Sequence, residues 1–355
     1  MIGPRINHVP AIVSLVALLA LACGDTKPNG SQTTPTPPDR PAADAGSLPP
    51  PAVIPDPPAT TDAGTPVVDA GDDDQVPDGG RITLPDAGGP VTYQGGTVDL
   101  MKFTVFGDIR PAIFEFDNQY PDDIVRAIAT QMNATGAQFA VGVGDYMFSF
   151  SERSVNTQLD KLLAAERPFT KPIFHAMGNH ECWGPTGVNC PNYNETPNVR
   201  LFLSRLFSFS QRPWYDFTVT TSKGDAKFVL IAQNSWNDQQ KQWLETTLAR
   251  PSTYTFIVRH QPSGTWTTPG LDECDRIVAA HPYTLLLVGH VHRYEKIRAN
   301  TVMAGHGGAP LEGGDFGYVL VEQQATGLLK IESRKKGDDS IVEAWKVDAT
   351  GTEIP

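Results

Sequence analysis

Five apolar segments of this sequence each end in residues of the kinds that bind metal ions. These residues are Asp, Asn or His, and a Gly stands directly before four of the five groups. The residues are Asp108, Asp145, Asn179, His180, His260, His290 and His292. One such residue at a strand end usually caps a helix or satisfies a local hydrogen bond, but five successive cases are hard to explain in this way.

Carboxylate oxygens, amide oxygens and imidazole nitrogens suit Mn²⁺, Fe and Zn²⁺ as ligands. None of these residues is a cysteine, which argues against a structural zinc site held by thiolates. Two cations about 3.5–4 Å apart can share a carboxylate and clamp the attacking and leaving oxygens of a phosphoryl transfer. We therefore predict a catalytic metal site whose ligands are Asp108, Asp145, Asn179, His260, His290 and His292.

The segments that carry these residues look like buried strands that alternate with helices. The strand segments are residues 100–106, 138–145, 171–180, 227–235, 253–260 and 283–292. Helical segments lie between several of them, notably Asn237–Arg250 and Leu271–Ala280. This alternation predicts an α/β fold, in which ligands bind at the carboxyl ends of the strands. Two or three alternating strands after Gly314 predict a second sheet.

Composition divides the chain into three predicted parts. An apolar run from Ala11 to Ala22 is too short to span a bilayer comfortably, so residues 1–22 are interpreted as a signal peptide. Residues 23–98 are rich in Pro, Ala, Asp and Gly and cannot bury enough apolar surface to become ordered, which predicts a disordered tether. Residues 99–355 are predicted to form one domain.

Cys23 bears on where the exported protein goes. Ala20-Leu21-Ala22-Cys23 resembles the lipobox of bacterial lipoproteins. That resemblance implies a lipid on Cys23 and a membrane-anchored protein in the periplasm or on the cell surface. Ala20–Ala22 also fits an A-x-A cleavage site for ordinary signal peptidase, which would leave a freely secreted protein.

The remaining cysteines and the net charge predict the state of the thiols and the kinds of partner. Cys182 and Cys190 surround Gly and Pro residues, which suits a small disulfide-closed loop in an oxidising compartment. Cys274 is expected to be buried and inert, with a reactive thiol as the alternative. The net charge is −12 and no basic stripe is present, so nucleic-acid binding is not expected. We expect a monomer.

The order Gly-Asp, Gly-Asp, Gly-Asn-His-Glu, His, Gly-His-x-His resembles the calcineurin-like metallophosphoesterases over the whole predicted domain. His260-Gln261-Pro262, the Gln242–Glu245 helix and Gly289–Glu295 are most similar to the purple acid phosphatase branch. The resemblance implies a four-layer fold of two mixed β-sheets flanked by helices. It also implies hydrolysis of a small phosphate mono- or diester.

The resemblance assigns a role to each residue of the predicted site. Asp145 would bridge two ions of Mn, Fe or Zn. Asn179, His260 and His290 would complete one site, and Asp108 and His292 would serve the other. His180 would lie beside the substrate phosphate, where it stabilises charge or protonates the leaving oxygen. A metal-bound hydroxide would be the nucleophile, because a metal can lower the pKa of its water from 15.7 to about 7.

Two residues depart from the family pattern at the Asp108 site. Arg110 stands where the family usually has a ligating His, and Phe148 stands where purple acid phosphatases have a ligating Tyr. Neither side chain can donate a lone pair to a metal. This site is therefore one ligand short, and water, substrate, Tyr146 or His306 are the candidates to fill the gap.

Arg110 has two interpretations, and both stay open at this point. It could form an ordinary salt bridge, or it could point into the site as a catalytic residue that offers bidentate positive charge to phosphate oxygens. His175 lies mid-strand and His281 ends a helix, so both are assigned to structure.

Three classes of function follow from these residues. A phosphoesterase is the leading hypothesis. The alternative is a surface lipoprotein that binds phosphate or another ligand with a degenerate, single-metal site, and the third class is a surface interaction module. Substrate choice depends on the loops Phe148–Asn156 and Cys182–Thr196. Their aromatic residues could stack on a ligand or pack inward; they are Phe148, Phe150, Trp183 and Tyr193.

Overall fold

The computed structural model describes residues 91–183, 189–190, 196–207, 210–264 and 270–355. The chain divides into two units, Met1–Asp69 and Ala70–Pro355, and only the second contains described residues. The predicted signal peptide, the lipidation of Cys23 and the tether as far as residue 90 lie outside the described residues, so they stay predictions.

The folded domain begins before Asp99, where the sequence predicted its start. Val91 is buried, and strand β1 (Gly96–Thr97) pairs in parallel with β5 (Tyr215–Thr221). The backbone N–H of Val98 also donates to Thr220 O at 3.0 Å. A two-residue edge strand is too short to show an apolar period, which is why composition placed these residues in the tether.

The first sheet has the strand order β14-β13-β12-β11-β2-β3-β4. Its strands are β2 (Lys102–Phe106), β3 (Phe139–Gly142), β4 (Ile173–His175), β11 (Gly317–Gln323), β12 (Leu329–Lys335), β13 (Ile341–Val347) and β14 (Glu353–Ile354). Strands β2, β3 and β4 are parallel, and β11 joins them antiparallel to β2. The strands after Gly314 therefore extend this sheet and do not build a separate one, which corrects the sequence-based prediction.

The second sheet has the order β1-β5-β6-β7-β8-β10-β9. Its further strands are β6 (Gly224–Ile231), β7 (Tyr254–Arg259), β8 (Leu285–Val288), β9 (Tyr294–Arg298) and β10 (Thr301–Ala304). Strands β6, β7, β8 and β10 are parallel, while β5 runs antiparallel to β6 and β9 runs antiparallel to β10. Both sheets are thus mixed, as the sequence predicted.

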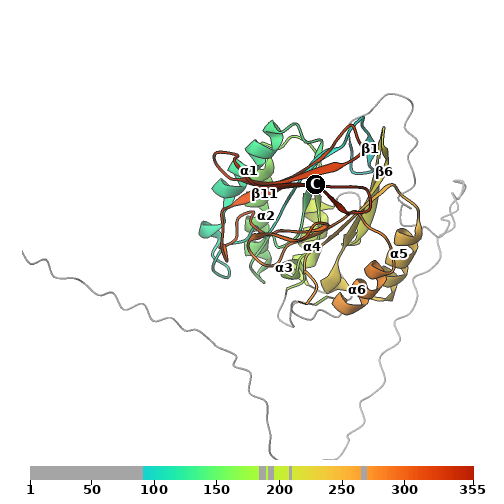
Figure 1. Cartoon of the computed structure of the whole chain (residues 1–355). Helices are drawn as coiled ribbons and strands as arrows, with labels where there is room; N and C mark the ends of the chain where they lie inside the picture. The colour runs from blue at the N-terminus through green and yellow to red at the C-terminus, as the bar shows by residue number, and fades with distance from the viewer. Residues whose placement is uncertain (1–90, 184–188, 191–195, 208–209, 265–269) are drawn as a thin grey trace, which may run out of the picture. The chain divides into compact units, whose positions relative to one another are not determined.

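Helices cover the outer faces of the two sheets (Figure 1). They are α1 (Asp122–Ala134), α2 (Glu152–Glu166), α3 (Asn179–Cys182), α4 (Pro197–Leu206), α5 (Asp238–Ala249) and α6 (Leu271–Ala279), with 3₁₀ turns η1 (Asp117–Gln119) and η2 (Gln233–Ser235). Apolar residues of α5 and α6 pack with residues of β6, β7, β8 and β10. Helices α1 and α2 lie on the opposite side of the molecule. The result is the predicted four-layer sandwich of two mixed sheets flanked by helices.

Side-chain caps set where several helices begin. Ser151 accepts a hydrogen bond from Ser154 N at the start of α2, and Asn237 accepts one from Gln240 N at the start of α5. Such caps satisfy N–H groups that have no partner within the helix. His281 follows the end of α6, where its N–H donates to Val278 O at 3.1 Å. Cys274 lies buried in α6, as expected.

Stacked aromatic rings fill the space between the sheets. Phe103 of β2 contacts Phe139 of β3 at a ring-centroid distance of 5.2 Å. Across the sandwich the same ring contacts Phe228 of β6 at 5.1 Å and Phe256 of β7 at 5.2 Å. All four side chains are fully buried. Phe103 therefore contacts aromatic rings of both sheets.

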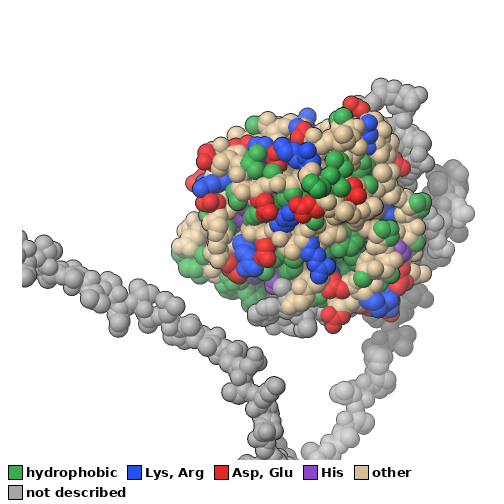
Figure 2. Space-filling view, in the orientation of Figure 1, with side chains coloured by type: hydrophobic (Ala, Val, Ile, Leu, Met, Phe, Trp, Pro, Cys, Tyr) green, Lys and Arg blue, Asp and Glu red, His purple; other side chains and the backbone are tan. Residues whose placement is uncertain are grey.

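Within the described ranges, no helix combines the length and apolar character needed to span a bilayer. On the face that Figure 2 shows, Lys and Arg side chains are interspersed with Asp and Glu and do not gather into a basic patch. The expected absence of nucleic-acid binding stays a prediction.

Replacing Phe103 tests whether the two sheets depend on this aromatic contact. Phe103→Ala is expected to lower the free energy of unfolding by about 3–5 kcal/mol, because it leaves a cavity between the sheets. The change would be measured by urea unfolding. Val342→Ala on β13, where the side chain is 58% exposed, is the control and should change stability by less than about 0.5 kcal/mol. A similar small loss for Phe103→Ala would contradict the assignment.

Candidate metal centre

The predicted ligands come from both sheets and meet at one place. Asp108, Asp145 and Asn179 follow β2, β3 and β4 of the first sheet, and His260 and His290 follow β7 and β8 of the second. Ligand atoms converge in two groups: Asp145, His260 and His290, and Asp108, Asp145 and His292. Asp145 belongs to both groups, so its carboxylate is the ligand that the two candidate sets share.

The backbone is unusual at three of these residues. Asp108, Asp145 and His290 have φ angles of 56°, 62° and 74°, in the left-handed region that residues other than Gly rarely adopt. Such conformations cost on the order of 1–3 kcal/mol each and persist at functional sites where the surroundings enforce them. The neighbouring glycines allow the close approach, since a Cβ on Gly178 would clash with Asp145 Oδ1.

The group around Asp145 and His260 has the spacing of ligands that surround one ion. Asp145 Oδ2 lies 3.2 Å from His260 Nε2, and His290 Nδ1 lies 3.3 Å from His260 Nε2 and 2.9 Å from Asn179 Oδ1. Adjacent ligands around an ion with bonds of about 2.1 Å are themselves separated by about 3.0–3.4 Å. His260 Nδ1 donates to Val143 O at 2.8 Å, which leaves Nε2 as the atom that faces the group. These residues fit a metal ion.

Buried negative charge creates the electrostatic demand for a cation here. Burial raises the pKa of Asp108 to about 8. Burial and the charge of Asp145 raise the pKa of Glu181 to about 7. Burial would also raise the pKa of Asp145, but the charges of His180 and His260 outweigh it and hold that pKa well below its usual range. Burial would lower the pKa of His260, yet the charge of Asp145 raises it to about 9.

His180 lies beside the group of Asp145, His260 and His290, and its backbone is closer to the Asp145 carboxylate than its ring is. Its backbone N–H donates to Asp145 Oδ1 at 3.0 Å, while its Nε2 is 3.6 Å from Asp145 Oδ2. Burial lowers the pKa of His180 to about 3, so the ring is neutral near pH 7. Its buried Nδ1 has no hydrogen-bond partner among the described residues. A neutral imidazole in this position can donate one hydrogen bond to a ligand.

The second group of candidate ligands, Asp108, Asp145 and His292, differs from the first because an arginine side chain lies against it. His292 Nε2 lies 3.7 Å from Asp108 Oδ1, and Arg110 Nη2 lies 3.3 Å from the same Nε2. Arg110 therefore points towards His292 in the second group, and its role in catalysis stays a prediction. Its guanidinium carbon is 4.5 Å from the centre of the Phe148 ring. The two residues that depart from the family pattern are thus in contact with each other.

Neither side chain suggested to fill the gap in this group does so. Tyr146 Oη accepts the N–H of Gly144 at 3.1 Å, and the Tyr146 ring packs against His175 and Phe202. His306 belongs to neither group of converging ligands and lines a separate cavity of about 350 Å³. His175 is buried and hydrogen-bonded to Glu166 at 3.0 Å, in keeping with its structural assignment.

Glu181 organises the site, a role that the sequence did not reveal. It is fully buried, and its carboxylate accepts N–H groups from Asp145 at 2.9 Å, Tyr146 at 2.7 Å and Gly178 at 2.6 Å. It thereby holds the end of β3 against the end of β4. Its place after Asn179 and His180 in the Gly-Asn-His-Glu motif was visible, but its three acceptor contacts could not be read from the chain.

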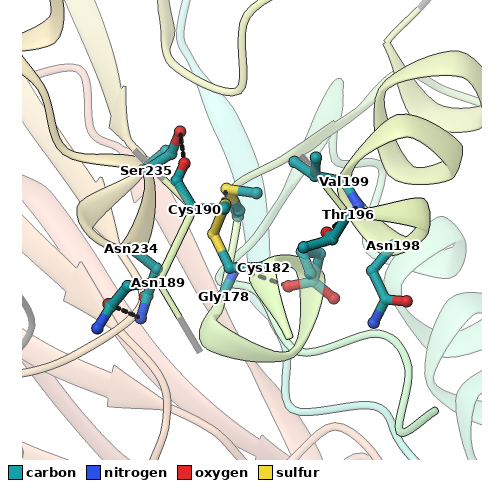
Figure 3. The surroundings of a disulfide bond; sticks show 12 residues. Gly178, Cys182, Asn189, Cys190, Thr196, Asn198, Val199, Asn234 and Ser235 are labelled. Carbon is teal, nitrogen blue, oxygen red and sulfur yellow. Dashed lines mark hydrogen bonds between the residues drawn. A yellow bond between two sulfur atoms is a disulfide. The ribbon is translucent and has the colours of Figure 1, made fainter. Parts of the chain in front are cut away.

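A disulfide bond between Cys182 and Cys190 supports the same region, as predicted (Figure 3). Cys190 N donates to Asn234 O at 2.8 Å, and Ser235 Oγ donates to Cys190 O at 2.9 Å. The bridge therefore ties α3, which follows the first sheet, to η2, which follows β6 of the second. Most of the predicted substrate loop after Cys182, including Tyr193, lies outside the described residues.

The loop aromatics that are described pack on one another. Phe148 stacks on Trp183 at 5.0 Å with an interplanar angle of 18°. Phe114 and Phe150 meet Trp183 edge-on at 5.3 Å and 4.7 Å. His180 lies edge-on to Phe148 at 4.8 Å. These rings are half-buried and form a wall beside Arg110 and His180, and their contact with a substrate stays a prediction.

Comparisons with known proteins agree with this architecture. Among solved structures the chain is similar to purple acid phosphatase PPD1 of yellow lupin (Lupinus luteus), with a TM-score of 0.53, 17% identity, 70% of this chain covered and 54% of that chain. It is similar to a dimetal phosphatase from Danio rerio, with a TM-score of 0.50 and 14% identity. That match covers 71% of this chain and 100% of that chain. It is also similar to GAP50, the anchor in the inner membrane complex of Plasmodium, with a TM-score of 0.50 and 15% identity. That match covers 71% of this chain and 90% of that chain.

These structural likenesses establish the fold alone, and the chain spans about half the length (54%) of the purple acid phosphatase. A search of curated proteins found no match. The family model for calcineurin-like phosphoesterases matches residues 101–294, which is just over half of the 355 residues. The matched region contains every predicted metal ligand, and the chain belongs to the calcineurin-like phosphoesterase family.

Proposed function

We propose that this chain is a metal-dependent hydrolase of phosphate esters. The observation that carries the proposal is the convergence of Asp145, Asn179, His260 and His290, whose facing atoms are 2.9–3.3 Å apart along the group. Oxygen and imidazole ligands with open positions favour a catalytic metal over a structural one. Membership of the phosphoesterase family supports the reaction type.

The residues of the chain divide the work of such a reaction. A bound metal would supply a polarised phosphoryl oxygen and an activated water at neutral pH. Asp145 and His260 hold the cation position, and Glu181 fixes the backbone on which Asp145 stands. His180 is neutral near pH 7 and would stabilise the charge that develops on the phosphate by donating a hydrogen bond. This role fits its low pKa better than proton donation does.

A phosphate- or ligand-binding protein with a single metal is the second candidate. The contact between Arg110 and His292 favours it, because this contact leaves one of the two cation positions without a complete set of ligands. The two candidates differ in turnover and not in metal binding, so hydrolysis is the measurement that separates them.

Substitution of the shared carboxylate tests the enzyme hypothesis. Aryl phosphate mono- and diesters would be supplied to the full chain with Mn²⁺, Fe²⁺ or Zn²⁺. Hydrolysis is expected for the wild type and a fall to the background rate for Asp145→Asn, because the cation position loses its buried negative charge. Asp160→Asn on α2, where the side chain is 67% exposed, is the matched control. Turnover that survives Asp145→Asn, or none with any metal, would rule the enzyme out.

The role of the His180 ring can be tested separately, because the backbone N–H that donates to Asp145 Oδ1 at 3.0 Å is retained in His180→Gln, whereas the ring lies 3.6 Å from Asp145 Oδ2. His180→Gln is expected to lower kcat by about 10²–10³-fold while the metal content stays unchanged. Steady-state kinetics and elemental analysis of the same samples would check this. His281→Gln, after the end of α6, is the control. An unaltered kcat for His180→Gln would show that the ring does not act on the reaction.

Glu181 should matter for metal affinity although it is not a predicted ligand. Glu181→Gln replaces an acceptor of three N–H groups with an amide that must turn a donor towards them, so Asp145 loses its position. The affinity for metal is expected to fall about 10–100-fold, as measured by calorimetric titration. Glu332→Gln changes a buried Glu on β12 that pairs with Lys330 and Arg334, and it serves as the control. Equal affinities for both variants would contradict the positioning role.

A further inference from the structure

Arg110 occupies the place where the second cation of the site would be held. Its Nη2 is 3.3 Å from His292 Nε2, and its Nη1 donates to Pro111 O at 3.3 Å. Its Nε is buried and has no hydrogen-bond partner among the described residues. A permanently charged group thus stands in the site with N–H donors still to be used.

The hydrogen bonds of His292 show that Arg110 and a metal ion would compete for one atom. His292 Nδ1 lies 2.9 Å from Pro310 O, and a carbonyl oxygen can only accept, so Nδ1 carries the proton. Nε2 of the neutral ring therefore holds the lone pair that faces Arg110. A metal would need the same lone pair at about 2.0–2.1 Å. One lone pair cannot serve both partners.

The carboxylate of Asp108 also accepts a hydrogen bond from the backbone. Its two carboxylate oxygens lie 3.1 Å and 3.0 Å from the backbone N–H of His290. Among the Asp, Glu, His and Cys side chains of the described residues, the group consists of Asp108, His292 and the shared Asp145, and a fixed cation faces it. The first group fits a metal ion. The second, with Arg110 in place, does not.

Phe148 explains why Arg110 stays where it is. The ring of Phe148 has the Arg110 guanidinium 4.5 Å from its centre and is stacked on Trp183 at 5.0 Å. A guanidinium over an aromatic face is attracted by the negative charge of that face. The wall formed by Phe148 and Trp183 is packed in turn against His180. The packing of these rings therefore holds the Arg110 side chain in its position.

We infer that Arg110 replaces the second cation of this centre. The chain binds one metal ion, at Asp145, Asn179, His260 and His290, and the Arg110 guanidinium supplies the other positive charge that holds the phosphate of the ester. This inference rests on the proposed function. A guanidinium suits the role because it is always charged and presents parallel N–H groups to two oxygens of one phosphate.

Metal counting on the full chain tests the inference. Wild type, Arg110→His and Arg126→His would be equilibrated with Mn²⁺ or Zn²⁺ and analysed for metal per chain. One equivalent is expected for the wild type. Two are expected for Arg110→His, which removes the competing cation and adds an imidazole. Arg126→His, on the exposed side of α1, makes the same change away from the site and should keep one equivalent.

Phosphate affinity provides a second measurement that does not depend on turnover. Arg110→Ala is expected to weaken the calorimetric Kd for inorganic phosphate at least about tenfold, since hydrogen bonds from a charged donor are lost. Circular dichroism melting would show that each variant is folded. Arg126→Ala is the control for this change and should bind phosphate like the wild type.

The possible results separate this inference from the proposed function. Two equivalents in the wild type would overturn the inference and leave a phosphoesterase intact. One equivalent in Arg110→His would also overturn it, because Arg110 would then not be what excludes the second ion. Unchanged phosphate affinity in folded Arg110→Ala would remove the role in binding. A wild type that binds no metal at all would overturn the inference and the proposed function together.

Discussion

The buried carboxylate of Asp145 is the constraint on which the rest of this structure depends. It is 1% exposed, belongs to both groups of converging ligands and sits in the left-handed backbone region. A buried charge of this kind is tolerated only with compensation, and here compensation comes from a hydrogen bond to one of its oxygens and from positive charge beside the other. The backbone N–H of His180 supplies the first and His260 part of the second. The remaining demand for positive charge makes the centre a candidate cation site.

The two sheets each supply half of this site, so their relative position decides whether it exists. The first sheet delivers Asp108, Asp145 and Asn179, and the second delivers His260 and His290. The edge-on contacts of Phe103 with rings of the other sheet help to set the separation of the sheets, and the disulfide bond of Cys182 ties the segments beyond the strand ends. Rigid elements behind each ligand are what a metal centre needs, because its ligand spacing tolerates little error.

The second half of the centre shows how one fold can meet the same electrostatic demand in two ways. A metal ion offers concentrated charge and a bound water but needs free lone pairs. A guanidinium offers fixed charge and directed N–H donors and instead uses the lone pair of His292. Arg110 and Phe148 touch, so they act as a pair: the aromatic ring that cannot ligate a metal holds the arginine that takes its place.

The sequence by itself determined the buried strands, the α/β class and the residues at the strand ends, because burial and turn chemistry leave local patterns in apolar residues, Gly, Asp and His. It placed Asp145 and His260 in one site, since strand ends of such sheets converge. It did not determine which sheet receives the strands after Gly314, nor that Glu181 accepts three N–H groups. Only the tertiary structure decided these points and the contact between Arg110 and His292, which are 182 residues apart in the chain. Strand pairing and the contact between Arg110 and His292 join residues that are far apart in the sequence. A local pattern of apolar residues does not identify the distant residue or strand that will be contacted.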